Sequence, residues 1–471
     1  MKRNRERKIE KGLTEGRISA SIWKLALPMM IGGALQNLFT LVDLYFVGML
    51  GHIEVAALSI AGIIMSVLMM FIIGITTGTI ALIAHYTGNR KHEKTDEVFG
   101  QTILLGIIGS VIMLLITFFG VEPLLKLFGA KGDVLRFGAE FLRIIFGWSI
   151  VIFLFVGINQ SLRGSGDART PLKALIIANI INIFFCPLLI LGLWFFPRMG
   201  VAGSAAATVI GRSVGLIYLI LHICIRQSTI QLRWRWLKPN TAIMRRILSI
   251  GSYASLQVLV REISFLFLMR LVAHYGDVAI AAYGIGSRLR MVIMVPGFGF
   301  ANAASVLTGQ NLGAGQPDRA SRSTWRTVLY YEFLAIPVST LFIAFAPHLI
   351  AFFNDYPGVV SIGATYMRYL GATFPFLALT LVLGQAMNGA GDTRATTIVN
   401  AIGQLLVRIP LAYILALALG IGATGIWLGI NASDISQGIL MIFVFQMGHW
   451  KTAHAKHREK LEGKDYIYSN K

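Results

Sequence analysis

Acidic residues inside long apolar segments are the residues of this chain best placed to do chemistry. Holding a carboxylate within lipid is costly, so proteins keep it there mainly to bind or move an ion. The chain has 22 acidic residues, and apart from Glu54, the first residue of its segment, only five fall within segments apolar enough to cross a bilayer: Asp43, Glu140, Glu262, Glu332 and Asp434. Glu140 and Glu332 lie near the ends of their segments, where an interfacial role is expected. This leaves Asp43, Glu262 and Asp434 as candidate ion-binding residues.

Asp43 is the strongest of these candidates. It lies seven residues after Gln36, so the two side chains share one face of a helix. In a low-dielectric environment a carboxylate can take up a proton near neutral pH, and its ionised form can hold Na⁺ or a cationic ligand. The equivalent position in the second half of the chain is Leu268, so the fold itself does not require a carboxylate there. We therefore expect Asp43 to bind a cation, with a structural hydrogen-bond acceptor as the alternative.

Two asparagines in a later segment form a second polar feature. Asn179 and Asn182 are three residues apart and Cys186 follows one turn later, so all three lie on one face of a predicted helix. Amide side chains inside a membrane can ligate a bound group or hydrogen-bond to a neighbouring helix. Both roles are open for these two residues.

Two segments near the C-terminus carry polar stripes. One places a polar residue at every fourth position: Asn400, Gln404 and Arg408. The other carries Asn431 and Asp434 on one face. In the register of an internal repeat Asp434 corresponds to Arg212, which suggests charges lining an aqueous cavity. An ion pair that holds helices together is equally consistent with this pattern.

Glu262 has a basic neighbour, Arg261, and its equivalent in the first half is Asn37. Both halves are therefore polar at this position. Glu262 could belong to a cation site or form an ion pair with an arginine.

The elements that position these residues are membrane-spanning helices. Hydrophobic residues make up 55% of the chain and charged residues 14%, against about 25% charged in a typical soluble protein. Segments of the roughly 20 residues needed to span a bilayer recur twelve times. They are 22–48, 54–86, 98–120, 134–160, 172–194, 199–225, 246–273, 278–310, 325–346, 359–388, 395–419 and 422–448. The sequence thus predicts an all-α, polytopic membrane protein.

Lysine and arginine are distributed very unevenly along the chain. They number 42, and the net charge of +20 would suggest a nucleic-acid partner in a soluble protein. Here 26 of them lie in the two terminal tails and every second connection, and Lys173, Arg246 and Arg326 lie at the adjoining ends of spans, whereas the alternate connections hold only three. The positive-inside rule makes the basic face cytoplasmic. We expect a plasma-membrane (inner-membrane) protein that contacts lipids and no nucleic acid, with cytoplasmic tails at 1–21 and 449–471.

The chain contains an internal duplication at a spacing of 225 residues. Its densest match is NQSLRGSGDART (159–170) against GQAMNGAGDTRA (384–395), in which Gln160 recurs as Gln385. Near the end of each half the register slips, and GVAG (200–203) corresponds to GATG (422–425). The duplication predicts two parallel six-helix lobes, 22–225 and 246–448, an architecture suited to alternating access. A cytoplasmic linker, 226–245, joins them, and its RWRWLKP run is expected at an anionic lipid surface.

Other kinds of chemistry have no support in the sequence. The chain has no G-x-x-x-x-G-K-[ST] phosphate loop, which argues against ATP-driven transport by this chain alone. Its histidines show no metal-ligand spacing, and Cys186 and Cys224 imply no disulfide. We expect a non-enzymatic protein with no cofactor and no bound metal, apart from Na⁺ as an option at Asp43.

Several motifs together resemble the multidrug and toxic compound extrusion (MATE) family of secondary transporters. They include LQNLFTLVDLYFVGMLG (35–51), LRGSGDARTP (162–171), AAYGIGSRLR (281–290) and GIWLGINASDI (425–435), and the resemblance runs from about residue 20 to 448. It implies two lobes around a V-shaped cavity and export of organic, often cationic, compounds and drugs by antiport with a cation. The protein is expected to act as a monomer.

The resemblance also bears on individual residues. Asp43 occupies the position of the family's functional aspartate, but many relatives have a second aspartate where Cys186 stands. This departure favours H⁺ over Na⁺ as the coupling ion. Glu262 aligns with a glutamate of some members, which pair it with an acid in the tenth helix, yet segment 359–388 contains no acid.

The sequence thus predicts a secondary multidrug exporter with cation coupling at Asp43 and Glu262. The residues expected to bind substrate or line the cavity are Gln36, Asn37, Gln160, Asn179, Asn182, Asn400, Gln404 and Asp434. A flippase for lipid-linked precursors is the first alternative, kept open by four arginines that could bind phosphates: Arg212, Arg261, Arg288 and Arg290. A channel or receptor without coupling is the second.

Overall fold

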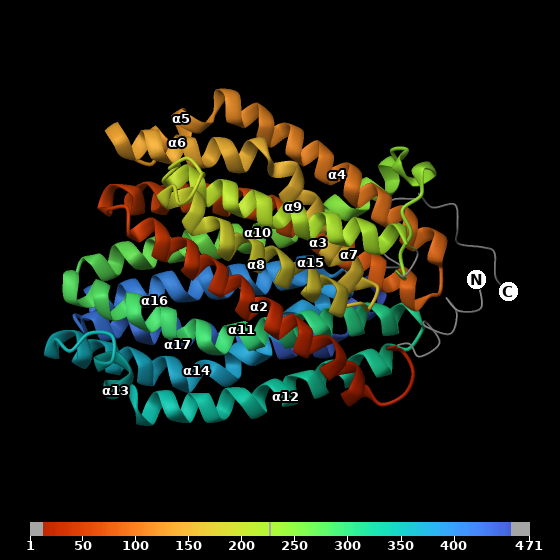
Figure 1. Cartoon of the computed structure of the whole chain (residues 1–471). Coiled ribbons are helices and arrows are strands. Elements are labelled where there is room, and N and C mark those ends of the chain that lie inside the picture. The colour runs from red at the N-terminus through yellow and green to blue at the C-terminus, as the bar shows by residue number, and fades with distance from the viewer. Residues whose placement is uncertain (1–12, 226–227, 454–471) are drawn as a thin grey trace. The chain divides into compact units, whose positions relative to one another are not determined.

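The computed structural model describes residues 13–225 and 228–453, and every element in these ranges is a helix (Figure 1). The outer parts of the predicted tails, 1–12 and 454–471, and the first two linker positions, 226–227, lie outside the described residues. All twelve segments predicted to span a membrane are helical.

The described residues divide into two compact units. Unit 1 comprises Ile31–Gly251, and unit 2 comprises Leu13–Met30 together with the chain from Ser252 onward. Two helices are shared between the units: α2 (Ile18–Gly48) and α10 (Thr241–Ala273). The others of unit 1 are α3 (His52–Gly88), α4 (His92–Phe119), α5 (Val121–Leu127), α6 (Gly132–Gly147), α7 (Ser149–Gly164), α8 (Arg169–Leu191), α9 (Val201–Cys224) and η1 (Trp234–Leu237).

Unit 2 is built from the helices of the second repeat. They are α11 (Asp277–Gly313), α12 (Pro317–Ala344), α13 (Ala346–Ala351), α14 (Pro357–Gly389), α15 (Thr393–Ala401), η2 (Ile402–Arg408), α16 (Ile409–Tyr413), η3 (Ile414–Ala418), α17 (Ala423–Met447) and η4 (His449–Thr452). The run from α15 to η3 is one continuous helical segment, in which η2 and η3 are wound as π-helix.

Ten helices among the described residues are long and apolar enough to cross a membrane. The pair α6 and α7, bent by 53° at the break between them, would provide an eleventh span. The remaining predicted segment, 246–273, lies in α10, which has 33 residues but is not among these spans.

Large apolar side chains on the surface fit a protein whose solvent is lipid. One strip on α4 exposes Ile108, Val111, Ile112, Leu115, Phe118 and Phe119, the last with 80% of its surface accessible. A water-soluble monomer rarely exposes such a contiguous apolar patch. The strip therefore indicates a face that contacts acyl chains.

Two helices are divided between the units. The N-terminal part of α2 belongs to unit 2 and its remainder to unit 1, whereas the N-terminal part of α10 belongs to unit 1 and its remainder to unit 2. In unit 2, the Trp23 ring of α2 lies 5.4 Å from the Phe300 ring in an edge-on contact, and the Tyr330 hydroxyl donates to Ser19 Oγ at 2.7 Å. In unit 1, the first turns of α10 bury Ile243 and Ile247 in an apolar cluster with residues of α3 and α4. Each repeat thus contributes its first helix to both units.

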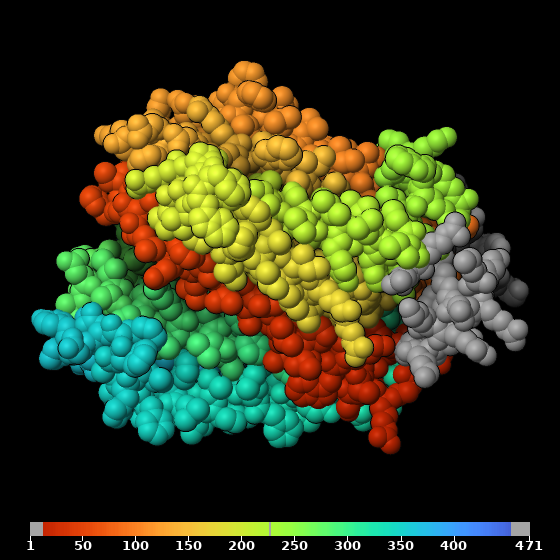
Figure 2. All heavy atoms as spheres, viewed as in Figure 1, coloured from red at the N-terminus to blue at the C-terminus, as the bar shows by residue number. Residues whose placement is uncertain are grey.

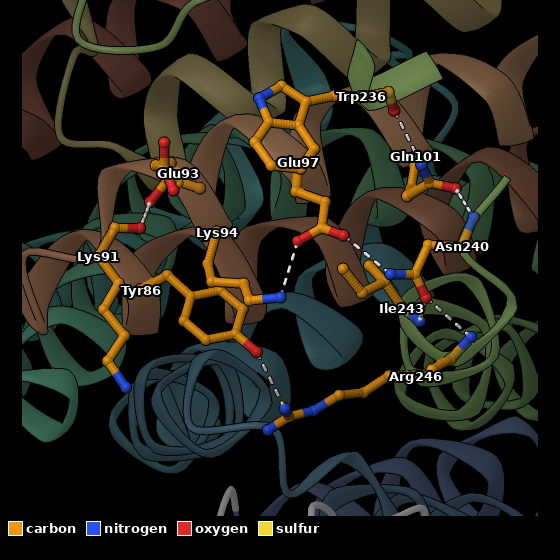
Figure 3. Close-up of polar contacts among 12 residues, drawn as sticks. Tyr86, Lys91, Glu93, Lys94, Glu97, Gln101, Trp236, Asn240, Ile243 and Arg246 are labelled. Carbon is orange, nitrogen blue, oxygen red and sulfur yellow. Dashed lines mark hydrogen bonds and ion pairs between the residues drawn. The ribbon is translucent and has the colours of Figure 1, made fainter. Parts of the chain in front are cut away.

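The connection between the repeats is anchored to α4 by specific hydrogen bonds (Figure 3). Gln101 Nε2 donates to the backbone carbonyls of Trp236 (2.8 Å) and Lys238 (2.9 Å), and Gln101 Oε1 accepts from the Asn240 backbone N–H at 2.9 Å. Gly100 leaves room for this docking, because a Cβ there would overlap the Trp236 carbonyl. Figure 2 shows the segment as a yellow-green projection beside the orange of α4.

The exposed side of the same segment fits an anionic lipid surface. Trp234 is 89% exposed, and Arg235 forms an exposed ion pair with Glu93 at 2.8 Å. The lipid contact expected for RWRWLKP stays a prediction.

Replacing Gln101 by Leu should release this segment. The change removes three hydrogen bonds to partly buried backbone groups, each worth about 0.5–1.5 kcal/mol. Limited trypsin digestion of the purified protein should then cleave faster at Arg233 and Arg235. Gln231→Leu is the matched control, because the Gln231 side chain bonds only the exposed Arg233; equal cleavage of the two variants would contradict an anchoring role for Gln101.

Candidate functional site

Asp43 lies within unit 1 where three helices meet. Its Oδ1 accepts from the Cys186 thiol of α8 at 3.3 Å, and its Oδ2 accepts from Thr208 Oγ1 of α9 at 3.4 Å. Asn182 of α8 also lies beside the carboxylate, and Arg212 of α9 acts on it electrostatically. The helical spacing that grouped Asn182 with Cys186 therefore places both next to Asp43.

The two predicted asparagines are buried without hydrogen-bond partners. Asn179 is 3% exposed and Asn182 is fully buried, and neither the amide oxygen nor the amide nitrogen of either side chain is hydrogen-bonded. Buried polar atoms are nearly always satisfied, so those that are not call for a missing partner such as water or an ion. The face of α8 toward Asp43 can thus offer two amide groups to a ligand.

Close packing of α8 against α9 brings Thr208 within reach of Asp43. A Cβ at Gly211 would overlap the backbone carbonyl of Ala178 and press on Asn182. Only glycine allows the helices to approach this closely. The Asp43 centre therefore depends on a backbone contact one turn away from Thr208.

The other residues predicted in the first half lie apart from this centre. Gln36 and Asn37 are exposed on α2. Gln160 of α7 is half-buried, and its Oε1 accepts from Arg163 Nη1 at 3.1 Å.

A second polar centre lies within unit 2 around Asp434 of α17. Arg290 of α11 donates from Nη2 to Asp434 Oδ2 at 2.9 Å, and Arg408 at the end of η2 donates from Nη2 to Oδ1 at 2.7 Å. The sequence left two roles open for Asp434, lining a cavity or forming an ion pair between helices. In the structure Asp434 forms ion pairs with two arginines.

The remaining predicted residues of the second half differ in their surroundings. Gln404 is buried, and its Oε1 has no hydrogen-bond partner. Asn400 donates to the Thr396 carbonyl at 2.9 Å. Glu262 lies 3.8 Å from Arg261 Nε with 44% of its side chain exposed, so this pair is weak.

Sequence reasoning missed Thr208 and the pairing of Arg290 with Asp434. Threonine is common in apolar helices, and nothing in the spacing of Thr208 marks it. Arg290 was noted only as a possible phosphate ligand, because its partner lies 144 positions away in the chain.

Replacing Gly211 by Ala should open the contact between α8 and α9. Overpacking of this kind typically costs about 1–3 kcal/mol, so the melting temperature of the purified protein should fall. Gly62→Ala on α3 is the control, because a Cβ there meets no atom within 4 Å and alanine favours a helix. If both substitutions left the melting temperature unchanged, the packing role of Gly211 would be wrong.

Comparisons with known proteins give consistent results. A family model described as MatE matches residues 28–188 and again 254–414, once in each half. The chain is 26% identical over 448 residues to the "Probable multidrug resistance protein YoeA" of Bacillus subtilis (strain 168), covering 93% of this chain and 96% of that protein. It is also 26% identical over 450 residues to an "FAD transporter" of Shewanella oneidensis, covering 92% and 96%.

Solved structures give the same answer for the fold. A structure described as the outward-facing conformation of a multidrug resistance MATE family transporter of the MOP superfamily has a TM-score of 0.87 to this chain at 24% identity, covering 94% of this chain and 98% of that chain. The double match of the family model and this likeness confirm the predicted all-α, duplicated fold.

Proposed function

The chain belongs to the MatE family of multi-span membrane transporters, and on that premise we propose that it exports small organic molecules by antiport with protons. Membership in the family is what the motifs of both halves led us to expect. The coupling ion, the substrate and the individual residues are proposals.

The arrangement around Asp43 carries this proposal. A carboxylate in the interior of a helical membrane unit is costly unless it is used, and Asp43 is held by a thiol and a hydroxyl rather than by a paired base. The unsatisfied amides of Asn179 and Asn182 lie on the same face of α8. Such a centre can exchange between a protonated state and an ionised state that accepts a cation.

A proton suits this centre better than Na⁺. Hard cations prefer carboxylate, carbonyl and water oxygens. A thiol occupies the position beside Asp43 Oδ1, where an oxygen ligand would be needed. A proton requires only the carboxylate itself.

In the proposed cycle, a proton from outside binds Asp43 and lowers the affinity of unit 1 for substrate. The two lobes then exchange access, the proton leaves to the cytoplasm, and a new substrate binds from the cytoplasm or inner leaflet. A ligand shifts such an equilibrium only through its different affinities for the two states.

The cargo is a small organic compound, often a cation or a drug. YoeA is named as a probable multidrug resistance protein, which supports this class, whereas the equally similar Shewanella protein is named an FAD transporter. We further propose a monomeric, non-enzymatic protein of the plasma membrane with both termini in the cytoplasm. The excess of bases on one face supports this orientation.

Asp43→Asn tests the coupling role directly. The amide keeps the size and hydrogen-bonding capacity of the side chain but cannot titrate, so proton-driven uptake of a fluorescent cation into inverted vesicles should fall to background. Asp133→Asn is the control, since Asp133 is exposed and within the described part of the chain pairs only with Arg136, at 3.3 Å. Uptake at the wild-type rate by the Asp43 variant, present at the wild-type level, would refute the proposal.

Cys186→Asp tests the choice of ion. The substitution places a second carboxylate beside Asp43, and two carboxylates favour a bound cation over two separate charges. We expect the variant to gain uptake driven by a sodium gradient that the wild type lacks. Sodium-driven uptake already present in the wild type would contradict the assignment of the proton.

A further inference from the structure

The polar centre of unit 2 has no part in the proposed coupling at Asp43. It comprises Arg290, Arg408 and Asp434, contributed by α11, η2 and α17. We propose that this centre binds an oxyanion, a carboxylate or phosphate group carried by the exported compound. The inference rests on the proposed export function and adds to it a substrate class: organic anions or zwitterions.

The charges of this centre do not balance. Two guanidinium groups share the single carboxylate of Asp434, and Asp434 is the one carboxylate that forms an ion pair with either arginine among the described residues. One positive charge is left over in the interior of a membrane unit. Such a charge is costly unless an anion compensates for it.

Hydrogen-bond donors are also in excess. Arg408 uses one Nη on Asp434, while its Nε is buried and has no hydrogen-bond partner. A guanidinium presents its N–H groups as a planar fork that matches carboxylate and phosphate oxygens. A bound oxyanion would supply both the missing charge and an acceptor.

Asp434 is the most buried of the three charged side chains. The side chain of Arg290 is 17% exposed and that of Arg408 is 10% exposed, whereas that of Asp434 is 4% exposed. The carboxylate is thus enclosed by the two arginines, and the excess positive charge lies around it.

The backbone at Arg408 has an uncommon form. Residues Ile402–Arg408 wind as π-helix, which is rare and frequently occurs at functional sites. Two side-chain hydroxyls bond carbonyls of this segment: Ser433 Oγ donates to the Gly403 carbonyl at 2.8 Å, and Ser264 Oγ donates to the Gln404 carbonyl at 3.3 Å. A π-helical turn contains about one residue more than an α-helical turn, and each extra residue rotates the following side chains by about 100° around the helix axis. The π-helical winding therefore determines the side of the helix on which Arg408 lies.

The internal repeat relates this centre to the one around Asp43. In the register of GVAG and GATG, Arg408 corresponds to Cys186 and Asp434 to Arg212. In unit 1 these two positions are occupied by Cys186 and Arg212, which lie beside the Asp43 carboxylate. In unit 2 they are occupied by Arg408 and Asp434, which form an ion pair. The duplicated framework carries one centre suited to cations and one suited to anions.

Binding of a matched pair of dyes tests the proposal. Rhodamine B has a free carboxylate, and rhodamine B ethyl ester lacks it but shares the rest of the molecule. Fluorescence anisotropy with the full chain in lipid nanodiscs should show tighter binding of the acid. Arg290→Gln should weaken binding of the acid by about tenfold or more, the loss of one charge-assisted hydrogen bond, without affecting the ester.

Arg288→Gln is the matched control, because Arg288 is exposed on the same helix; it should change neither affinity. Arg290→Lys serves if the glutamine variant does not fold: it keeps the charge but loses the fork, so the preference for the acid should shrink. Equal wild-type affinity for the two dyes, or an equal loss of both in Arg290→Gln, would overturn the proposal.

Competition identifies the source of the oxyanion. Benzoate should displace rhodamine B, and inorganic phosphate at the same concentration should not; equal displacement would assign the centre to free anions and overturn the substrate class. Because no ion gradient is applied, these results are independent of coupling at Asp43. Failure of the anion site with intact proton coupling would leave the export function standing.

Discussion

The low dielectric of the membrane interior governs how the charged groups within the membrane-spanning helices of this chain are held. A charge there persists only with a compensating partner or a ligand to bind. Asp434 is compensated twice, by Arg290 and Arg408. Among the described residues Asp43 accepts from a thiol and a hydroxyl, has the Asn182 amide beside it, and has no base within ion-pair distance. This difference separates a carboxylate held in an ion pair from the carboxylate that we propose exchanges a proton.

Duplication explains why two polar centres exist and why they differ. The same family model matches both halves, and both centres use corresponding helices of the repeat: α8 and α9 in unit 1, η2 and α17 in unit 2. A repeat provides equivalent places but does not require equivalent residues. Leu268 at the position equivalent to Asp43 shows that each half was free to change its chemistry.

The sequence predicted the helices well because lipid imposes a simple rule on their length and composition. It also singled out three residues that lie together in the structure: Asp43, Asn182 and Cys186. Asp43 stood out because a carboxylate is rare in such segments, and helical spacing placed Asn182 and Cys186 on one face. Thr208 could not be found in this way, since its contact with Asp43 depends on how closely α9 approaches α8 at Gly211.

The unit 2 centre was only partly predictable for related reasons. The four-residue spacing marked Arg408, but the π-helical winding that aims it breaks the 3.6-residue period on which sequence patterns rely. Arg290 belongs to a helix remote in sequence from Asp434, and only the folded chain brings them together. Glu262 had two open roles; it pairs weakly with the exposed Arg261, and its part in cation coupling stays a prediction.

Reciprocal coupling gives the most direct test of the central claim, that substrate and protons move in opposite directions through Asp43. Proteoliposomes with a trapped pH-sensitive dye receive a gradient of an organic cation in sodium-free buffer, with no initial pH difference. The account predicts that movement of the substrate down its gradient drives protons the other way and shifts the internal pH, and that Asp43→Asn abolishes the shift. Substrate movement at full rate with no change in internal pH would contradict it.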